Sequence, residues 1–181
     1  GATVTLGANG DSFFEYLLKL YVQANGADAM QVVLREWERT MDDMKARLVH
    51  LTYPNQKHFV AERQFASIAR RMDHLACFTP AMLLLGAPIS SGDRAAAYNA
   101  SAAQLLETCV EMYTSTPTGL APEVAQFDTS SLSPDVSPLR PENYLRPETV
   151  ESLFVMYRRT GEETYRDQAW AIFQAFETHT R

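Results

Sequence analysis

The apolar residues of this chain define two kinds of helical segment that alternate along the sequence, and this alternation constrains the fold most strongly. Segments of the first kind are apolar on nearly all sides and cover residues 11–23, 75–85 and 150–157. Segments of the second kind carry one apolar stripe and cover residues 28–50, 93–113 and 163–178. A helix that is apolar all round is expected to be buried, and a striped helix to lie at the surface. The sequence therefore predicts three pairs, each of an inner and an outer helix.

Helix pairs that recur in this way fit either an open solenoid or a closed α/α barrel. Solenoid helices usually keep a polar side, which the inner segments lack, so the pattern favours an all-α fold that is part of a barrel. Three pairs are too few to close one. The chain also begins at Gly1 within an expected loop and ends at Arg181, directly after a helical segment. We therefore expect residues 1–181 to be one partial barrel domain, truncated at both ends.

Two long connections interrupt the helical pattern. Residues 52–66 include Phe59 and Val60 after a turn-forming run at residues 53–56, which predicts a short hairpin. Residues 114–144 are rich in Pro, Ser, Thr and Asp. A loop of that length in a compact fold is usually functional or disordered. Because Glu123 lies near its start, we favour a functional loop.

Length and charge narrow the function classes. The 181 residues suffice for one domain with a real core. The net charge of −6 provides no basic surface for nucleic acid and suits a cation or a neutral polar ligand such as a sugar. We find no apolar run long enough to span a bilayer and no signal peptide.

Two further features bear on the cellular compartment. Cys77 and Cys109 are the two cysteines, and they fit either buried free thiols in a cytosolic protein or a single disulfide. Asn99-Ala100-Ser101 is an N-glycosylation sequon. Together they favour a secretory compartment.

Acidic residues recur at the expected helix starts. Arg146-Pro147-Glu148 opens the third inner segment, where a proline in the first turn loses no hydrogen bond and an acid is stabilised by the helix dipole. The comparable acids elsewhere are Asp11, Asp73 and, after Pro122, Glu123. If the helix starts gather at one end of the fold, these carboxylates form one site.

Each candidate also has a purely structural interpretation. Asp11 fits a helix N-cap, Glu148 a first-turn acid, Glu123 a solvated loop acid, His74 a core histidine and Arg146 the ion-pair partner of a neighbouring glutamate. We find neither metal-ligand spacing of His or Cys nor a phosphate-binding loop nor a nucleophile elbow. Carboxylates with one arginine and one histidine suit acid–base chemistry on a neutral polar substrate, and a glycosidic bond fits best.

Four blocks of the sequence resemble glycoside hydrolase family 47, the class I α-1,2-mannosidases, and they occur in the family's order. The blocks are residues 5–19, which include Gly10-Asp11-Ser12; residues 72–78; residues 118–123; and residues 145–154. The Cys-Phe-Thr-Pro run at residues 77–80 is closer to the endoplasmic-reticulum type than to the Golgi type.

The resemblance implies part of an (α/α)7 barrel, the catalytic domain of a glycosidase. Such an enzyme hydrolyses terminal α-1,2-linked mannose from high-mannose N-glycans with inversion, in glycan processing, glycoprotein quality control and endoplasmic-reticulum-associated degradation. The family's catalytic carboxylates fall on Asp11, Glu123 and Glu148. We expect Glu148 on the base side, with Asp11 and Glu123 acting as the acid or relaying to it.

The resemblance also implies binding and structural roles. Substrate-binding positions fall on Arg146, His74, Asp73 and Asn9. The endoplasmic-reticulum type carries Arg at the last of these, a position that helps to choose the glycan branch, so the resemblance leaves the branch selectivity of this chain open. The family's disulfide falls on Cys77 and Cys109. In the loop-entropy model this bridge stabilises the fold by roughly 3–4 kcal/mol.

Other family features are expected outside this stretch. They are a further catalytic Glu, the C-terminal threonine that binds Ca²⁺, and the anchor of a type II membrane protein of the endoplasmic reticulum or Golgi lumen. We therefore expect a monomer whose partner is a high-mannose N-glycan and whose membrane contact comes only through that anchor. These 181 residues alone should be inactive and bind Ca²⁺ poorly.

The alternatives are a mannose-binding, lectin-like relative without turnover and a helical-repeat scaffold that binds protein. A scaffold would leave Asp11 and Glu148 solvated on separate ridges.

Overall fold

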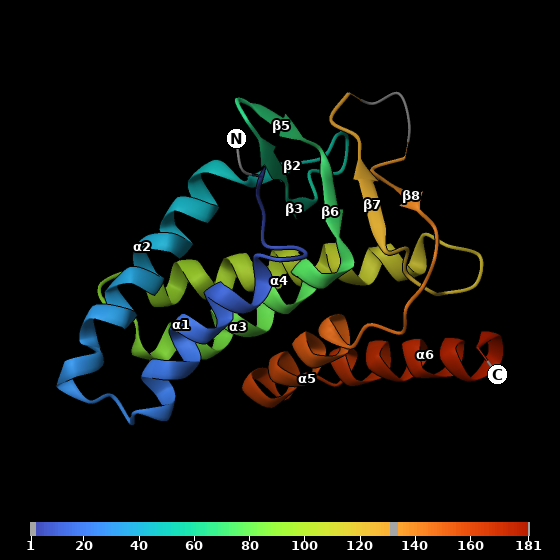
Figure 1. Cartoon of the computed structure of the whole chain (residues 1–181). Coiled ribbons are helices and arrows are strands. Elements are labelled where there is room, and N and C mark those ends of the chain that lie inside the picture. The colour runs from blue at the N-terminus through green and yellow to red at the C-terminus, as the bar shows by residue number, and fades with distance from the viewer. Residues whose placement is uncertain (1–2, 131–133, 181) are drawn as a thin grey trace.

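The computed structural model describes residues 3–130 and 134–180, which form a mainly helical fold with short strands (Figure 1). Within these residues the α-helices are α1 (Asp11–Gln23), α2 (Gln31–Arg47), α3 (Thr79–Gly86), α4 (Arg94–Thr114), α5 (Glu148–Thr160) and α6 (Glu163–His179). Short 3₁₀ turns precede α2 (η1, Asp28–Met30), precede α3 (η2, His74–Phe78) and follow α3 (η3, Ala87–Ile89). None of the described helices is both long and apolar enough to span a bilayer.

The helices pack in the predicted pairs, α1 with α2, α3 with α4 and α5 with α6 (Figure 1). The predicted stripe of α4 is buried throughout, and its members are Tyr98, Ala102, Leu105, Leu106, Cys109 and Met112. Helix α3 is enclosed between α4, α5 and α1. A Cβ on Gly86 would lie 2.0 Å from the Trp37 ring, so glycine lets that ring of α2 lie directly against α3.

The expectation that the inner helices are buried on most sides is wrong for α1. Only Leu18 of α1 is buried, while Phe13 is 64% exposed and Tyr16 is also exposed. Phe154 of α5 is likewise 61% exposed. The physical reason is that α1 packs mainly on α2 and has only small contacts with α3 and η2, which leaves side chains such as Phe13 without cover from the described residues. Helix α3 meets the expectation because it has neighbours on several sides.

An all-α description is too narrow, because the described residues also form three small antiparallel sheets. Their strand orders are β1-β4-β5, β2-β3 and β6-β7-β8. The strands are β1 (Thr3–Val4), β2 (Val49–Leu51), β3 (His58–Val60), β4 (Glu62–Gln64), β5 (Ser67–Ala69), β6 (Arg71–Asp73), β7 (Val124–Phe127) and β8 (Val136–Arg140).

The hairpin expected around residues 52–66 is confirmed as the pairing of β2 with β3, in which Val49 lies opposite Val60. Residues 114–144, however, are not only a loop, since they contain β7 and β8. Strands this short give too few residues for a period-two pattern to be recognised. Strand β7 also pairs with β6, a partner distant in the sequence.

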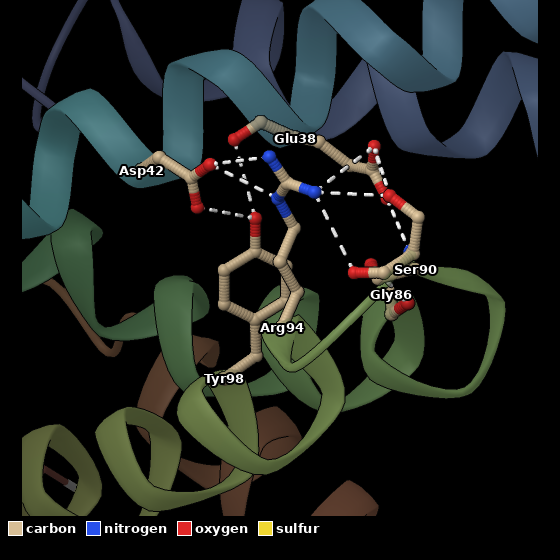
Figure 2. Close-up of polar contacts among 7 residues, drawn as sticks. Glu38, Asp42, Gly86, Ser90, Arg94 and Tyr98 are labelled. Atoms are coloured by element: carbon tan, nitrogen blue, oxygen red, sulfur yellow. Dashed lines mark hydrogen bonds and ion pairs between the residues drawn. The ribbon is translucent and has the colours of Figure 1, made fainter.

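A polar network joins the outer helices α2 and α4 (Figure 2). Glu38, 5% exposed, accepts the backbone N–H of Ser91 at 2.7 Å. Arg94 donates to Asp42 at 2.9 Å through Nε. The Tyr98 hydroxyl donates to Asp42 Oδ1 at 3.0 Å and approaches the Glu38 carbonyl at 3.2 Å. These partners offset the cost of burying a carboxylate and a phenol between α2 and α4.

Removing the Tyr98 hydroxyl should show how much this polar network contributes to the free energy of unfolding. We expect Tyr98→Phe to lower the free energy of unfolding by about 1–2 kcal/mol, because Asp42 loses a donor while the ring stays packed. The matched control is Tyr157→Phe, whose hydroxyl makes only an exposed 3.5 Å contact with Glu163, and it should change stability little. Equal urea midpoints for both variants would contradict this account.

Candidate active site

The inner helices α1, α3 and α5 all begin on the side of the molecule that carries the strands (Figure 1). Asp11 is the first residue of α1 and Glu148 the first of α5, while Asp73 ends β6 directly before η2. Asp73 lies opposite Val124 in the β6–β7 pairing, which places Glu123 beside it. The backbone N–H of His74 donates to the Glu123 carbonyl at 2.9 Å. The structure therefore brings the predicted acids to one end of the fold.

Glu123 and Arg146 form a two-point ion pair inside this site. Glu123 is 6% exposed, so it is not the solvated loop acid that its sequence also allowed. Arg146 Nε donates to Glu123 Oε2 at 2.6 Å, and the second contact joins Arg146 Nη2 to Glu123 Oε1. Such a fork fixes the guanidinium plane as well as neutralising the buried charge. Arg146 also lies over the ring of Tyr144, 5.8 Å from its centroid.

Glu148 is half-buried and carries one carboxylate oxygen without a partner. Its Oε2 is buried and accepts no hydrogen bond from any described residue. Burial raises the pKa of Glu148, the nearby charges of Glu151 and Asp11 add to this, and Arg146 opposes it. Buried polar atoms are nearly always hydrogen-bonded, so an unpaired carboxylate oxygen indicates a place for water or a ligand.

Asp11 lies close enough to Glu148 to raise the pKa of that carboxyl. Asp11 does not cap α1, because it is itself the first helical residue and Gly10 occupies the N-cap. Its Oδ1 accepts the N–H of Ser12 at 2.8 Å, and its side chain is only partly buried. Asp11 and Glu148 are therefore close enough for their charges to interact, unlike residues on separate ridges.

The loop before α1 packs closely on Asp73. Asp73 Oδ2 accepts the N–H of Ala8 at 3.0 Å, and a Cβ on Gly7 would lie 2.4 Å from the same oxygen. Glycine is therefore required there. Burial is the largest cause that raises the pKa of Asp73. Asn9 is exposed, has a φ of 70°, and lines a cavity of about 360 Å³ whose lining comes from residues 3–14 and includes none of the candidate acids.

His74 is a core residue, 1% exposed. Its Nε2 lies 3.0 Å from the Tyr113 hydroxyl and 3.1 Å from that of Thr149. Burial lowers the pKa of His74 to about 4, so the ring is neutral at physiological pH. This geometry supports a positioning role, because His74 connects Glu123 through its backbone and the residue after Glu148 through its ring.

Sequence reasoning missed Tyr113 and Thr149. Thr149 directly follows Glu148, and Tyr113 continues the buried stripe of α4 one turn after Cys109. Those two positions are the signal that could have identified them. The expected disulfide between Cys77 and Cys109 is present and ties η2 to α4, one turn away from the contact of His74 with Tyr113.

The described residues contain no group of three or more His, Cys, Asp or Glu side chains that could hold a metal ion. The acids of this site therefore do not by themselves fit a Ca²⁺ centre.

Comparison with known proteins gives consistent results. The family model described as glycosyl hydrolase family 47 matches residues 1–181. The mannosyl-oligosaccharide 1,2-alpha-mannosidase MNS1 of Arabidopsis thaliana is 42% identical over 99% of this chain and 31% of its own length. The endoplasmic reticulum mannosyl-oligosaccharide 1,2-alpha-mannosidase of Rattus norvegicus is 38% identical over 98% of this chain and 27% of its own. The chain thus spans about a third or less of these relatives.

Among solved structures, the alpha-1,2-mannosidase from Trichoderma reesei superposes with a TM-score of 0.84 at 25% sequence identity. The superposition covers 97% of this chain and 39% of that protein. The arrangement of α1 to α6 and the short strands therefore corresponds to part of a larger fold.

Breaking the fork between Arg146 and Glu123 should destabilise the site. We expect Arg146→Gln to lower the free energy of unfolding by about 2–4 kcal/mol, because a buried carboxylate loses its cation. Arg140→Gln is the matched control, since it removes an exposed 3.8 Å pair with Glu142 and should cost about 0–1 kcal/mol. The double change of Arg146→Gln with Glu123→Gln should recover part of the loss. Similar losses for the two single arginine variants would argue against a buried pair.

His74 should make folding sensitive to acid. The unfolded chain binds a proton at the ordinary histidine pKa of 6.5, whereas folded His74 does so only near pH 4. Stability contributed by neutral His74 is therefore complete above pH 6.5 and is lost as the pH falls to about 4. The loss is on the order of 3 kcal/mol.

Two measurements check this. The pH dependence of the free energy of unfolding, compared between the wild type and His74→Gln, isolates His74 from the carboxyls with raised pKa. Titration of the His74 ring followed by NMR gives its pKa directly, and a midpoint near 6.5 would show that the ring is not buried in a neutral state.

Proposed function

This chain belongs to glycosyl hydrolase family 47, and from that premise we propose that it supplies part of the active site of an inverting α-1,2-mannosidase. The proposed reaction removes terminal α-1,2-linked mannose from high-mannose N-glycans on glycoproteins. The observation that carries the proposal is Glu148, whose buried oxygen lacks a partner while its carboxyl lies near Asp11 and Arg146. The names of the relatives, which are mannosyl-oligosaccharide 1,2-alpha-mannosidases, support the substrate class.

An inverting glycosidase needs one carboxylate to activate water and one acid to protonate the leaving oxygen, roughly 6.5–9.5 Å apart. We assign the base to Glu148. Its position at the start of α5 lets the helix dipole stabilise the carboxylate, while burial raises its pKa and strengthens it as a base. The unpaired Oε2 is available to orient the attacking water.

The acid side is assigned to Asp11 and Glu123. Asp11 is partly exposed and forms no ion pair with an arginine among the described residues, so we place it to pass a proton to the leaving oxygen. Arg146 binds both oxygens of Glu123. We therefore propose that Glu123 acts indirectly, by orienting the Arg146 guanidinium toward Glu148 and Asp73. Asp73 and Asn9 are proposed to bind sugar hydroxyls, and Asn9 to set branch selectivity. His74 is proposed to hold Glu123 and the start of α5 in position.

Residues 1–181 are proposed to be one part of an (α/α)7 catalytic barrel. The exposed faces of α1 and α5 support this, because Phe13 and Phe154 are the side chains that further barrel helices would cover. The matched length, 39% of the Trichoderma reesei enzyme chain, agrees with it. Turnover and Ca²⁺ binding are then properties of the complete barrel.

The proposed compartment is the lumen of the endoplasmic reticulum or the Golgi, with a type II membrane anchor outside these residues and a monomeric enzyme. The name of the Rattus norvegicus relative places it in the endoplasmic reticulum. The Cys77–Cys109 disulfide supports an oxidising compartment.

A mannose-binding relative without turnover would present much the same pocket, and the test below separates the two functions. A helical-repeat scaffold is disfavoured, because the acids converge at one end of the fold.

The test is Glu148→Gln in the full-length protein that carries this chain, assayed on a high-mannose glycan. We expect kcat to fall by roughly 10²–10⁴-fold, because the neutral amide cannot accept a proton from water. Proton NMR of the wild-type reaction should show mannose released first as the β-anomer, as inversion requires. Glycan binding by the wild type without mannose release would instead identify the lectin-like function.

Glu151→Gln is the matched control, one turn further along α5 and exposed. It should keep turnover. Because Glu151 helps to raise the pKa of Glu148, removing it should shift the acidic limb of the pH profile to lower pH. A base works only when ionised, so activity is lost as the pH falls through the pKa of Glu148. An unchanged rate in Glu148→Gln would end the assignment.

A further inference from the structure

The sequon Asn99-Ala100-Ser101 lies within α4, on the side of that helix that faces away from the core. Figure 2 shows the preceding residue, Tyr98, pointing from α4 toward Asp42 of α2. The buried stripe of α4 continues from Tyr98 through Ala102 and Leu105. Asn99 falls outside that stripe and is exposed.

The surroundings of Asn99 leave room for a bulky group. The exposed residues beside it on α4 are Ala96, Ala100 and Ala103. The structure describes every residue of α4, and none of the large apolar side chains of this helix is exposed. A group attached to Asn99 therefore projects into solvent without displacing a packed side chain or covering an apolar surface that a neighbouring helix needs.

The modification would also lie far from the candidate active site. Tyr113 of α4 contacts His74, and Asn99 precedes Tyr113 by almost four helical turns. That separation is about 20 Å along the helix axis. A glycan on Asn99 thus emerges near the opposite end of α4 from the acids and does not cover the candidate active site.

The disulfide bond of α4 indicates an oxidising compartment. Cys109 of α4 is disulfide-bonded to Cys77, and such bonds persist in the endoplasmic-reticulum lumen, where oligosaccharides are also transferred to sequons. Asn99 is the only residue of the printed sequence that begins an Asn-x-Ser/Thr motif.

We propose that Asn99 is an N-glycosylation acceptor, so that this glycan-trimming domain itself carries an N-glycan on its outer surface. The donor is a lipid-linked diphosphate oligosaccharide. Asn99 Nδ2 forms a bond to the anomeric carbon, the bond from that carbon to phosphate oxygen breaks, and the lipid diphosphate leaves with the electron pair. The amide loses one proton to the transferase. This inference does not depend on the catalytic roles of the acids.

The test is made on the full-length protein that carries this chain, expressed in the endoplasmic-reticulum lumen of a eukaryotic cell. Peptide:N-glycosidase treatment in heavy-oxygen water converts a glycosylated Asn to labelled Asp, and mass spectrometry then locates the label. We expect the label at Asn99 and its loss in both Asn99→Gln and Ser101→Ala. Ser101→Thr should retain it, because a hydroxyl stays at the third position of the sequon.

Gln104→Asn is the matched control, since it adds a second exposed Asn to α4 without creating a sequon, and position 104 should stay unlabelled. Thiol alkylation confirms the Cys77–Cys109 bond and hence the lumenal history of the sample. Unlabelled Asn99 in protein with that disulfide intact would overturn the proposal. Asn99→Gln should also leave mannose release unchanged, and a loss of turnover in a correctly folded variant would contradict the remote placement of the glycan.

Discussion

The pairing of β6 with β7 is the constraint on which the rest of the site depends. It joins residues 71–73 to residues 124–126 and so places Asp73 and Glu123 on adjacent strands, with the His74 N–H bonded to the Glu123 carbonyl. The η2 turn and α3 follow β6 directly, and the chain after β8 leads into α5. A few short backbone ladders thus decide where two inner helices begin.

Gathering acids at one place has an electrostatic cost that the fold offsets only in part. One cation, Arg146, forks onto Glu123, and its charge is also felt by Glu148 and Asp73. Burial raises the pKa of Glu148 and of Asp73, so their ionised forms are less favourable than in water. Proteins tolerate such perturbed groups mainly at functional sites. The neutral, buried side chains of His74, Tyr113 and Thr149 are joined by hydrogen bonds, which connect η2 with α4 and α5.

The helices and their pairing could be predicted because a helix repeats its apolar pattern over several turns, as the stripe of α4 does from Tyr98 to Met112. The sheets could not, since each strand has only two to five residues and β7 pairs across a long sequence separation. The burial of α1 was overestimated for a related reason. The local apolar pattern shows that a helix face, such as the one that carries Phe13, is suited to packing. It does not show whether these residues contain a neighbour to pack against it.

The sequence by itself determined the helix order, the acids at the helix starts, the cysteines and the family resemblance, because these depend on residue type and local spacing. Only the tertiary structure decided that Arg146 forks onto Glu123, that His74 is a neutral core residue, and that one oxygen of Glu148 is buried without a partner. Those properties depend on distances and desolvation between residues far apart in the chain. No local pattern encodes them, because the same side chain is solvated or buried according to what packs over it.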